Sequence, residues 1–568
     1  MVVHVPPPLV ESSLPSEPAA DIVLRGGAVH TVDDARPKAE AVAIRAGRIA
    51  AVGADREVDG LIGPRTRVIE LRGRTVLPGF QDAHIHPPSS GLDALRCDLR
   101  EPAGRAPYDA TEVVDLLRRY AQAHPDDPWI LGSGWYMGAF PNGTPHRRQL
   151  DAAVGDRPAF VPNRDGHSAW VSSRALALAG ITADTPDPVG GRIERDPDGS
   201  PSGILHEAAA ELVERIIPPD TQADVEAGLL HAQAGLHALG ITSWQDAIVR
   251  PIDQAAYLAV AGRGQLTARV VGALWWDRGW DERGVEELKA RRAAGEFGRY
   301  RSTSVKIMVD GVLETFTGAL LEPYLPADGG SPDRTGMLFV EPERLRRVTA
   351  LLDGAGFQVH FHAIGDRAVR EALDAVEVAR TANGPSDGRH HIAHIQVIHP
   401  TDLPRFAQLD VVANAQPYWA SHEPQMDRLT IPFLGPERST WQYPFKSLLR
   451  HGARLAMGSD WSVTTADPLL EMEIAVNRAY SEPGFDHPPF LPEERLTLDE
   501  AVRAFTLGSA YVQHQDDATG SLTVGKLADV IVLDRDLFDR GAGQIGQARV
   551  VATFIEGVPV HEDAALGG

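Results

Sequence analysis

Runs of apolar, β-branched residues alternate with amphipathic helical runs through the middle of the chain. This alternation is typical of βα units that build a parallel sheet. Eight units favour a (β/α)8 barrel over a doubly wound sheet, which usually has about six strands. A doubly wound sheet also needs a Gly-rich turn after its first strand, and this chain has no such turn at that position. The eight predicted strands are 75–84, 241–247, 267–274, 302–311, 357–363, 390–397, 411–417 and 454–460.

Short alternating strands separated by Gly-containing turns occur at both ends of the chain. IVLRGGAVHTV and TRVIELRGRTVLPG have this pattern near the start, and DVIVLD and RVVATFIEG repeat it near the other end. Neither end has enough strands for a stable sheet of its own. We therefore expect one small β-domain built from residues 21–76 and 516–562, with two separate terminal sheets as the alternative. The Pro-rich segment 1–20 is predicted to be disordered.

The first two predicted barrel strands are separated by about 160 residues, far more than one βα unit needs. The surplus, residues 89–210, then lies in the loop after the first strand, while the barrel comprises 77–88 and 211–515. In a barrel this loop lies on the C-terminal face, where ligands bind. The stretch PWILGSGWYMGAFPNGTPHR suits a structured insertion that covers the active-site mouth, with a solvated decoration as the alternative.

Composition narrows the class of protein. The chain has 55 basic and 78 acidic residues, a formal charge of −23, which argues against nucleic acid or an anionic membrane as a partner. Cys97 is the only cysteine, so no disulfide within the chain is possible. No run of about 18 apolar residues predicts a membrane span, and the first residues lack the pattern of a signal peptide. We expect a cytoplasmic protein and leave open whether it forms a homodimer or a higher homo-oligomer.

Several residues that could bind a metal lie at or near the carboxyl ends of the predicted strands. These ends converge at the mouth of a barrel, so residues hundreds of positions apart would meet there. Four imidazoles and a carboxylate are a ligand set for Zn²⁺ or a similar divalent ion. The candidates are His84, His86, Lys306, His362, His394 and Asp460.

Some neighbouring residues have two interpretations. His84 and His86 project to the same side of an extended strand, so both can reach one ion. Asp82 shares that side but lies deeper, where it would support a histidine. Lys306 is either a buried lysine paired with Asp310 or Glu314, or a carbamate that bridges two metals; its sequence context does not decide. Four further histidines are interpreted as core or surface residues: His390, His391, His399 and His422.

Six motifs of this chain resemble, in order, those of the amidohydrolase superfamily. They are PGFQDAHIHP, VKIMVDG, VHFHAIGDRAV, HIAHIQVIHP, GSDWSV and GSLTVGKLADVIVLDRDLF. More narrowly, the chain is similar to the YtcJ-like (amidohydrolase 3) branch, which includes N-substituted formamide deformylases. The likeness extends from about residue 22 to 560 and includes RDGHSAWVSSRALALAGI in the insertion. It implies a distorted (β/α)8 barrel with a small β-sandwich formed by both chain ends.

The resemblance also implies a centre of one or two metal ions, with Zn²⁺ expected and another divalent metal as the alternative. His362 is preferred to His360 because it lies nearer the strand end and directly precedes AIGD. By position in the motifs, His84 and His86 would bind the more buried metal, His362 and His394 the other, Lys306 would bridge as a carbamate, and Asp460 would bind metal and transfer protons.

Two positions depart from the branch. Ala393 precedes the strand-six histidine where the branch usually has an acidic residue, which removes a side chain that could support a metal ligand. Trp461 follows Asp460 where the branch commonly has a small residue, so the tryptophan would narrow or reshape the pocket.

The expected reaction is metal-assisted hydrolysis of a C–N bond in a small-molecule amide, an N-acyl or N-formyl compound. Asp460 would act as general base and then general acid. His167 would orient the substrate carbonyl, or else serve as a capping or packing residue. Trp135, Tyr136 and Trp461 are candidates for an aromatic pocket, although large aromatics also build cores. The alternatives are hydrolysis of a cyclic amide or carbamate, deamination, metal-dependent isomerisation or lyase chemistry, and a non-catalytic barrel scaffold.

Overall fold

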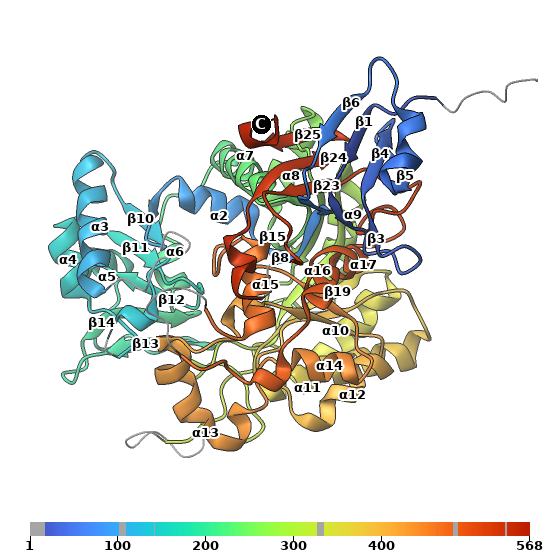
Figure 1. Cartoon of the computed structure of the whole chain (residues 1–568). Coiled ribbons are helices and arrows are strands. Elements are labelled where there is room, and N and C mark those ends of the chain that lie inside the picture. Colours follow the sequence, from blue (N-terminus) through green and yellow to red (C-terminus); the bar gives the residue numbers. More distant parts are fainter. Residues whose placement is uncertain are drawn as a thin grey trace, which may run out of the picture.

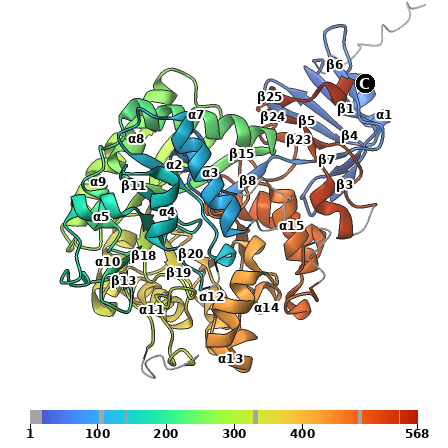
Figure 2. The same cartoon turned by 90° about the vertical axis from the view of Figure 1, so that its left-hand side faces the viewer.

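Four β-sheets organise the chain in the computed structural model (Figures 1 and 2). The structure describes residues 18–100, 109–140, 142–326, 334–480, 487–539 and 542–567. Most of the segment predicted to be disordered, up to residue 17, lies outside these ranges. The central sheet is the barrel, and the fourth sheet belongs to the insertion. Of the two further sheets, one contains strands from the start of the chain and the other combines strands from both chain ends.

Eight parallel strands follow one another around the barrel in chain order, which confirms the predicted fold class. The strands are β8 (Phe80–Ile85), β15 (Ile241–Val249), β16 (Arg269–Trp275), β18 (Tyr300–Met308), β19 (Gln358–Ala363), β20 (His391–His394), β21 (Val412–Ala415) and β22 (Leu455–Met457). The first and last strands meet at the mouth, where the main-chain N–H of Asp460 donates to the carbonyl of His84 at 2.7 Å. Strands such as β8 and β19 are buried at every position, as expected for a sheet covered on both faces.

One predicted strand, 75–84, is in fact two. β7 (Thr75–Pro78) belongs to a sheet of the chain ends, and β8 begins after Gly79. The whole run is buried, so its hydrophobic pattern carries no signal for the change of sheet. A side chain at Gly79 would lie 2.5 Å from Thr242 of β15, so this junction needs a glycine.

Helices cover the outside of the barrel. Helix α7 begins at a capping box, in which the side chains of Thr221 and Asp224 each accept the other's main-chain N–H. Helix α11 buries its Ala, Val and Leu side chains in the large core that surrounds the strands. In the described ranges, none of the helices is long and apolar enough to cross a lipid bilayer. The main covering helices are α7 (Gln222–Ala238), α8 (Pro251–Gly262), α9 (Gly284–Ala294), α10 (Pro342–Gly354), α11 (Asp366–Asn383), α12 (Leu403–Gln408), α14 (Phe445–Arg450) and α15 (Pro468–Asn477).

Helix α2 (Pro87–Ala94) starts directly after the first barrel strand, with two prolines in its first turn, where their missing N–H groups cost nothing. It packs on α7 through two glycines. A Cβ on Gly91 would lie 2.0 Å from the carbonyl oxygen of Gly228, and a Cβ on Gly228 would lie 2.6 Å from the main-chain atoms of Pro88 and Leu92. The two helices therefore touch backbone to backbone.

Strands from both chain ends form a small β-sandwich, where blue and red strands lie side by side in Figure 1. β7 pairs with β23 in antiparallel fashion, which joins the two ends in one sheet. Arg269 of β16 ties this part to the barrel, because its guanidinium contacts the buried Asp529 and also Glu556 at 2.9 Å. One sheet has the order β5 (Arg48–Gly53), β4 (Ala41–Arg45), β1 (Ile22–Arg25), β6 (Arg67–Glu70); the other has β25 (Val558–Glu562), β24 (Val550–Ile555), β23 (Val530–Leu533), β7, β2 (Ala28–His30), β3 (Lys38–Ala39).

The insertion after β8 is a folded unit with its own sheet and core, on the left of Figure 1. Its core contains Trp135, Phe140 and Trp170, which contact one another edge to face. The sheet has the order β13 (Gly191–Arg195), β14 (Pro201–Glu207), β12 (Ser168–Val171), β11 (Ala159–Pro162), β10 (Ile130–Ser133), β9 (Cys97–Asp98), and the helices are α3 (Ala110–Ala123), α4 (Arg147–Val154) and α5 (Ser173–Ala179).

Candidate metal centre

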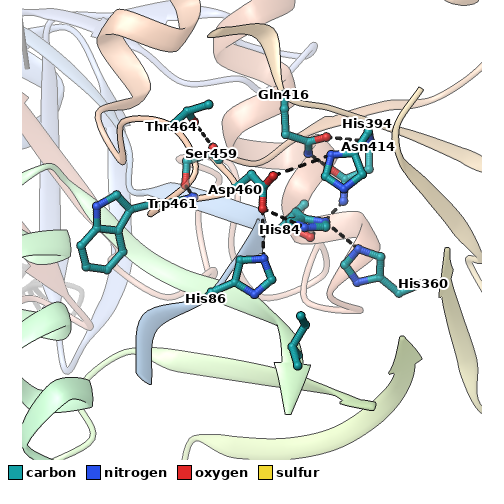
Figure 3. Close-up of polar contacts among 12 residues, drawn as sticks. His84, His86, His360, His394, Asn414, Gln416, Ser459, Asp460, Trp461 and Thr464 are labelled. Atoms are coloured by element: carbon teal, nitrogen blue, oxygen red, sulfur yellow. Dashed lines mark hydrogen bonds and ion pairs between the residues drawn. The ribbon is translucent and has the colours of Figure 1, made fainter. Parts of the chain in front are cut away.

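Three predicted ligands converge at the carboxyl end of the barrel (Figure 3). His84 lies in β8, His86 follows that strand, and Asp460 follows β22. Asp460 Oδ1 is 3.0 Å from Nε2 of His86 and 3.2 Å from Nε2 of His84. The ligand atoms of the three residues all lie within 4.8 Å of one another, so a single ion could contact each of them.

The residues present fit a divalent metal. His84 Nε2 is buried and has no hydrogen-bond partner in the described part of the chain, although it faces the Asp460 carboxylate. Leaving a buried polar atom unpaired costs about 1–3 kcal/mol, so such an atom points to a missing partner. Two imidazole nitrogens and a carboxylate oxygen aimed at one point are ligands that zinc accepts. Asp460 also has a left-handed backbone, with φ of 55°, a strain that is typical of functional sites.

The electrostatics keep these ligands in their metal-binding forms. Burial, followed by the charge of Lys306, lowers the pKa of His84 to about 3, so its imidazole is neutral. Burial alone would raise the pKa of Asp460, but the contacts with His84 and His86 outweigh it and hold this pKa well below its usual range. Asp460 is therefore a carboxylate beside two imidazoles.

His362 and His394 lie beside this cluster, in β19 and at the end of β20. Their ring centroids are 4.5 Å apart, and His394 Nδ1 is 3.8 Å from Asp460 Oδ2. Both line the same cavity of about 400 Å³ as His84, His86 and Asp460. His394 has a left-handed backbone, with φ of 74°, and its main-chain N–H donates to Oε1 of Gln416 at 2.7 Å. The structure thus brings all four predicted histidines to one cavity.

Lys306 lies in the wall of the same cavity, and its side chain is buried. Burial lowers its pKa to about 7, which leaves part of the amine neutral and nucleophilic. Asp310 instead accepts main-chain N–H groups, including that of Gly365 at 2.9 Å, and Glu314 accepts from Thr430 at 2.7 Å. Among the residues that the structure describes, neither carboxylate forms an ion pair with Lys306, so the geometry offers no support for the simple paired lysine.

Polar residues behind the ligands connect neighbouring strands. Asp82 accepts the main-chain N–H groups of His84 at 3.0 Å and Ser459 at 3.1 Å, so it joins β8 to β22. Gln416, which holds His394, also donates to Asn414 at 3.0 Å. Gln416 and Asn414 are not among the site residues predicted from the sequence. Their position at the end of the seventh strand, in VANAQP, is the signal that could have drawn attention to them.

The insertion contributes His167 to the cavity. Its Nδ1 is 2.8 Å from Oε1 of Glu207, and its ring centroid is 5.6 Å from that of His362. Burial alone would lower the pKa of His167, but the Glu207 carboxylate outweighs it and raises the pKa to about 9. Thr317 donates to the same Glu207 oxygen at 2.9 Å. Glu207, the last residue of β14, is not among the site residues predicted from the sequence.

The three aromatic candidates are placed differently from the expected pocket. Trp135 is fully buried in the core of the insertion, and its indole N–H donates to the carbonyl of Val161 at 2.9 Å. Tyr136 links the insertion to the barrel, because its hydroxyl donates to Glu423 at 2.9 Å. Neither is among the described residues that line the metal-site cavity, so both are corrected to packing and linking positions. Trp461 turns away from the ligands in Figure 3 and lines a second cavity, of about 930 Å³.

A (β/α)8 barrel with a His–His–Asp cluster at its carboxyl end defines the class of metal-dependent barrel hydrolases. The model of the amidohydrolase family matches residues 67–561, and the chain belongs to this family. It is 32% identical to Protein LONG AFTER FAR-RED 3 of Arabidopsis thaliana, over 96% of this chain and 92% of that protein. It is 30% identical to the putative amidohydrolase YtcJ of Bacillus subtilis, over 95% of this chain and 99% of that protein. It is 28% identical to an N-substituted formamide deformylase of Arthrobacter pascens, over 95% of this chain and 98% of that protein.

A solved structure agrees with these relatives. The crystal structure of an uncharacterized metal-dependent hydrolase from Pyrococcus horikoshii matches 91% of this chain and 97% of its own, with a TM-score of 0.70 and 26% identity. These comparisons confirm the predicted YtcJ-like branch, and the chain is a metal-dependent hydrolase of the amidohydrolase family.

Proposed function

We propose that the protein hydrolyses the C–N bond of a small-molecule amide, with N-acyl amines, N-formyl amines among them, as the substrate class. The observation that carries the proposal is the convergence of His84, His86 and Asp460 at the mouth of a family barrel. A relative of nearly the same length bears the name N-substituted formamide deformylase, which supports the choice of N-formyl compounds.

Zinc is the metal we propose, because nitrogen ligands with one carboxylate suit it. His84, His86 and Asp460 would hold one ion. His362 and His394 would hold a second, with Lys306 bridging as a carbamate. A bound ion supplies a Lewis acid and a water whose pKa is lowered to about 7.

The chain's own residues divide the remaining work. Asp460, ionised beside two imidazoles, takes the proton of the attacking water and returns it to the leaving nitrogen. His167 faces the same cavity from the insertion. Its pKa is raised to about 9, so at neutral pH both ring nitrogens carry a proton: Nδ1 donates to Glu207, and Nε2 can donate to the substrate carbonyl. Residues of the barrel and of the insertion together line the cavity, so the insertion limits the access of water.

A metal analysis combined with a substrate panel tests this proposal. Protein purified without added metal should contain at least one zinc ion per chain, and it should release amine from N-formyl or N-acetyl amines. Asp460→Asn protein serves as the inactive control. Ammonia release from amidines would instead indicate a deaminase, and hydrolysis of cyclic amides or carbamates alone would move the substrate class. Absence of both stoichiometric metal and C–N hydrolysis would overturn the proposal.

We also propose where the enzyme acts and how it assembles. The charge of −23 and the single cysteine support a cytoplasmic enzyme that acts on small molecules rather than on nucleic acid or membranes. We propose a homodimer or higher homo-oligomer as its assembly. Light scattering after size-exclusion chromatography measures the mass, and a mass near 61.3 kDa would contradict this assembly.

A further inference from the structure

A fifth histidine, His360, lies beside His84 at the edge of the cluster of candidate ligands (Figure 3). It is fully buried in β19, two residues before His362. Its Nε2 is 2.8 Å from Nδ1 of His84, the ring nitrogen that faces away from Asp460. His360 thus contacts a candidate metal ligand on the side of its ring opposite to Asp460.

Two imidazole nitrogens at this distance share a single proton. One of them must donate its N–H and the other must accept with its lone pair. His84 can bind a metal through Nε2 only if that nitrogen carries a lone pair, so its proton must then reside on Nδ1. In that arrangement His84 donates to His360. In the opposite arrangement His360 donates, the proton of His84 moves to Nε2, and the nitrogen that faces Asp460 can no longer bind an ion.

We propose that His360 is the positioning residue that holds His84 in its metal-binding tautomer by accepting the Nδ1–H hydrogen bond. The inference rests on the proposed metal centre. Metal-bound histidines usually donate to a carboxylate, a main-chain carbonyl or water. Here the acceptor is an imidazole, which can accept a hydrogen bond only in its neutral form. It therefore orients His84 without adding negative charge to the centre.

Contacts beneath His360 hold its ring in place. The ring centroid of His391 is 4.0 Å away. Asn414 donates one N–H to the carbonyl of Ala83 at 2.9 Å and the other to Nδ1 of His391 at 3.1 Å. Asn414 therefore fixes the tautomer of His391 and links it to the strand that carries His84. In this arrangement the proton of His360 lies on Nδ1, which is buried without a hydrogen-bond partner among the residues described, at a cost of about 1–3 kcal/mol.

Zinc affinity, measured by competition with a chelator, tests the proposal without any substrate. His360→Leu removes the acceptor, and zinc binding should weaken by about 10–100-fold. His360→Gln places an amide oxygen near the position of Nε2, and its affinity should stay within about threefold of the parent protein. His390→Gln is the matched control. His390 is equally buried in the same part of the barrel but bonds Asp353 at 2.9 Å, so its replacement should leave zinc affinity unchanged.

The outcomes separate the inference from the proposed function. If the parent protein binds no zinc, the metal centre itself is refuted. If the parent binds zinc and a folded His360→Leu protein binds it equally well, only the role of His360 is refuted. Should His360→Leu fail to fold, a crystal structure of the zinc-loaded parent protein decides. It should show His84 bound through Nε2 with Nδ1 within hydrogen-bond distance of His360, and ligation through Nδ1 would overturn the proposal.

Discussion

The contact between Gly91 and Gly228 makes the metal centre sensitive to a methyl group on the outside of the barrel. Helix α2 follows His86 without a linker and rests on the backbone of α7. We predict that Gly228→Ala moves α2, and with it His86, away from Asp460. Loss of both stability and metal affinity is the expected result.

The structure gives the size of the effect. The new Cβ would lie 2.6 Å from main-chain atoms of Pro88 and Leu92, about 0.8 Å closer than the 3.4 Å at which ordinary contact begins. Overpacking of this kind costs about 1–3 kcal/mol. Alanine gains about 0.5–1 kcal/mol over glycine inside a helix, which offsets only part of this cost. A displacement approaching 1 Å at an active site can lower turnover by about 100-fold.

Gly235→Ala is the matched control, because Gly235 lies in the same helix and a Cβ there meets no atom within 4 Å. The assay compares thermal unfolding at one scan rate and zinc affinity for both variants. Gly235→Ala should unfold at or above the temperature of the parent protein with unchanged zinc affinity, whereas Gly228→Ala should unfold lower and bind zinc about tenfold more weakly. If the two variants behave alike, the argument that α2 positions His86 is wrong.

Four further predictions concern charge, metal and catalysis. Asp460→Asn should lower kcat by about 10²–10⁴-fold with an unchanged circular dichroism spectrum, and near-normal kcat would refute its role in proton transfer. The pKa of His167 is raised to about 9 from its ordinary 6.5, so the stability from its pair with Glu207 is complete below about pH 6.5 and is lost as the pH rises through 9. Between pH 7 and pH 10 the unfolding temperature should therefore fall less for Glu207→Gln than for the parent protein. An equal fall in both proteins would contradict the pairing. Arg269→Met leaves Asp529 buried without its partner and should lower the free energy of unfolding, measured in urea, by about 3–5 kcal/mol. Arg25→Ala breaks the exposed contact with Asp59 and should lower it by less than about 1 kcal/mol. Removal of metal with a chelator should lower both the unfolding temperature and the activity, and excess zinc should restore them. Zinc at 100 times its Kd stabilises the folded protein by about 2.7 kcal/mol. An unfolding temperature that does not change with the chelator would contradict a contribution of the metal to stability.

The barrel could be predicted from the sequence because its signal is local. Five of the eight strands are buried at every position, and helical patterns follow the strands along the chain. Strand ends in a barrel converge, so the meeting of His84, His86 and Asp460 followed from their positions alone. The division of 75–84 at Gly79 could not be predicted, because both strands are buried at every position and no alternation of polar and apolar residues marks the change of sheet.

The finer parts of the site depend on contacts across strands, which periodicity does not encode. His360 and His362 both lie near the end of β19, and only the packed structure shows that His360 faces His84. Glu207 lies 40 residues after His167 in the chain, and their contact depends on how the insertion folds. Aromatic composition likewise could not separate Trp135, a core residue, from a pocket residue, because both uses favour large rings.

The pairing of β7 with β23 can form only after nearly the whole chain has been synthesised. The two strands are about 450 residues apart, so at about 5–20 residues per second β7 waits about 20–90 s during synthesis for its neighbour. His84 is made within the first part of the chain, but Asp460 emerges only near the end. The metal-binding residues therefore cannot assemble while most of the chain is being translated. A centre that needs Asp460 can therefore be completed only late in synthesis, and until β23 is made the edge of β7 that it pairs with has no neighbouring strand.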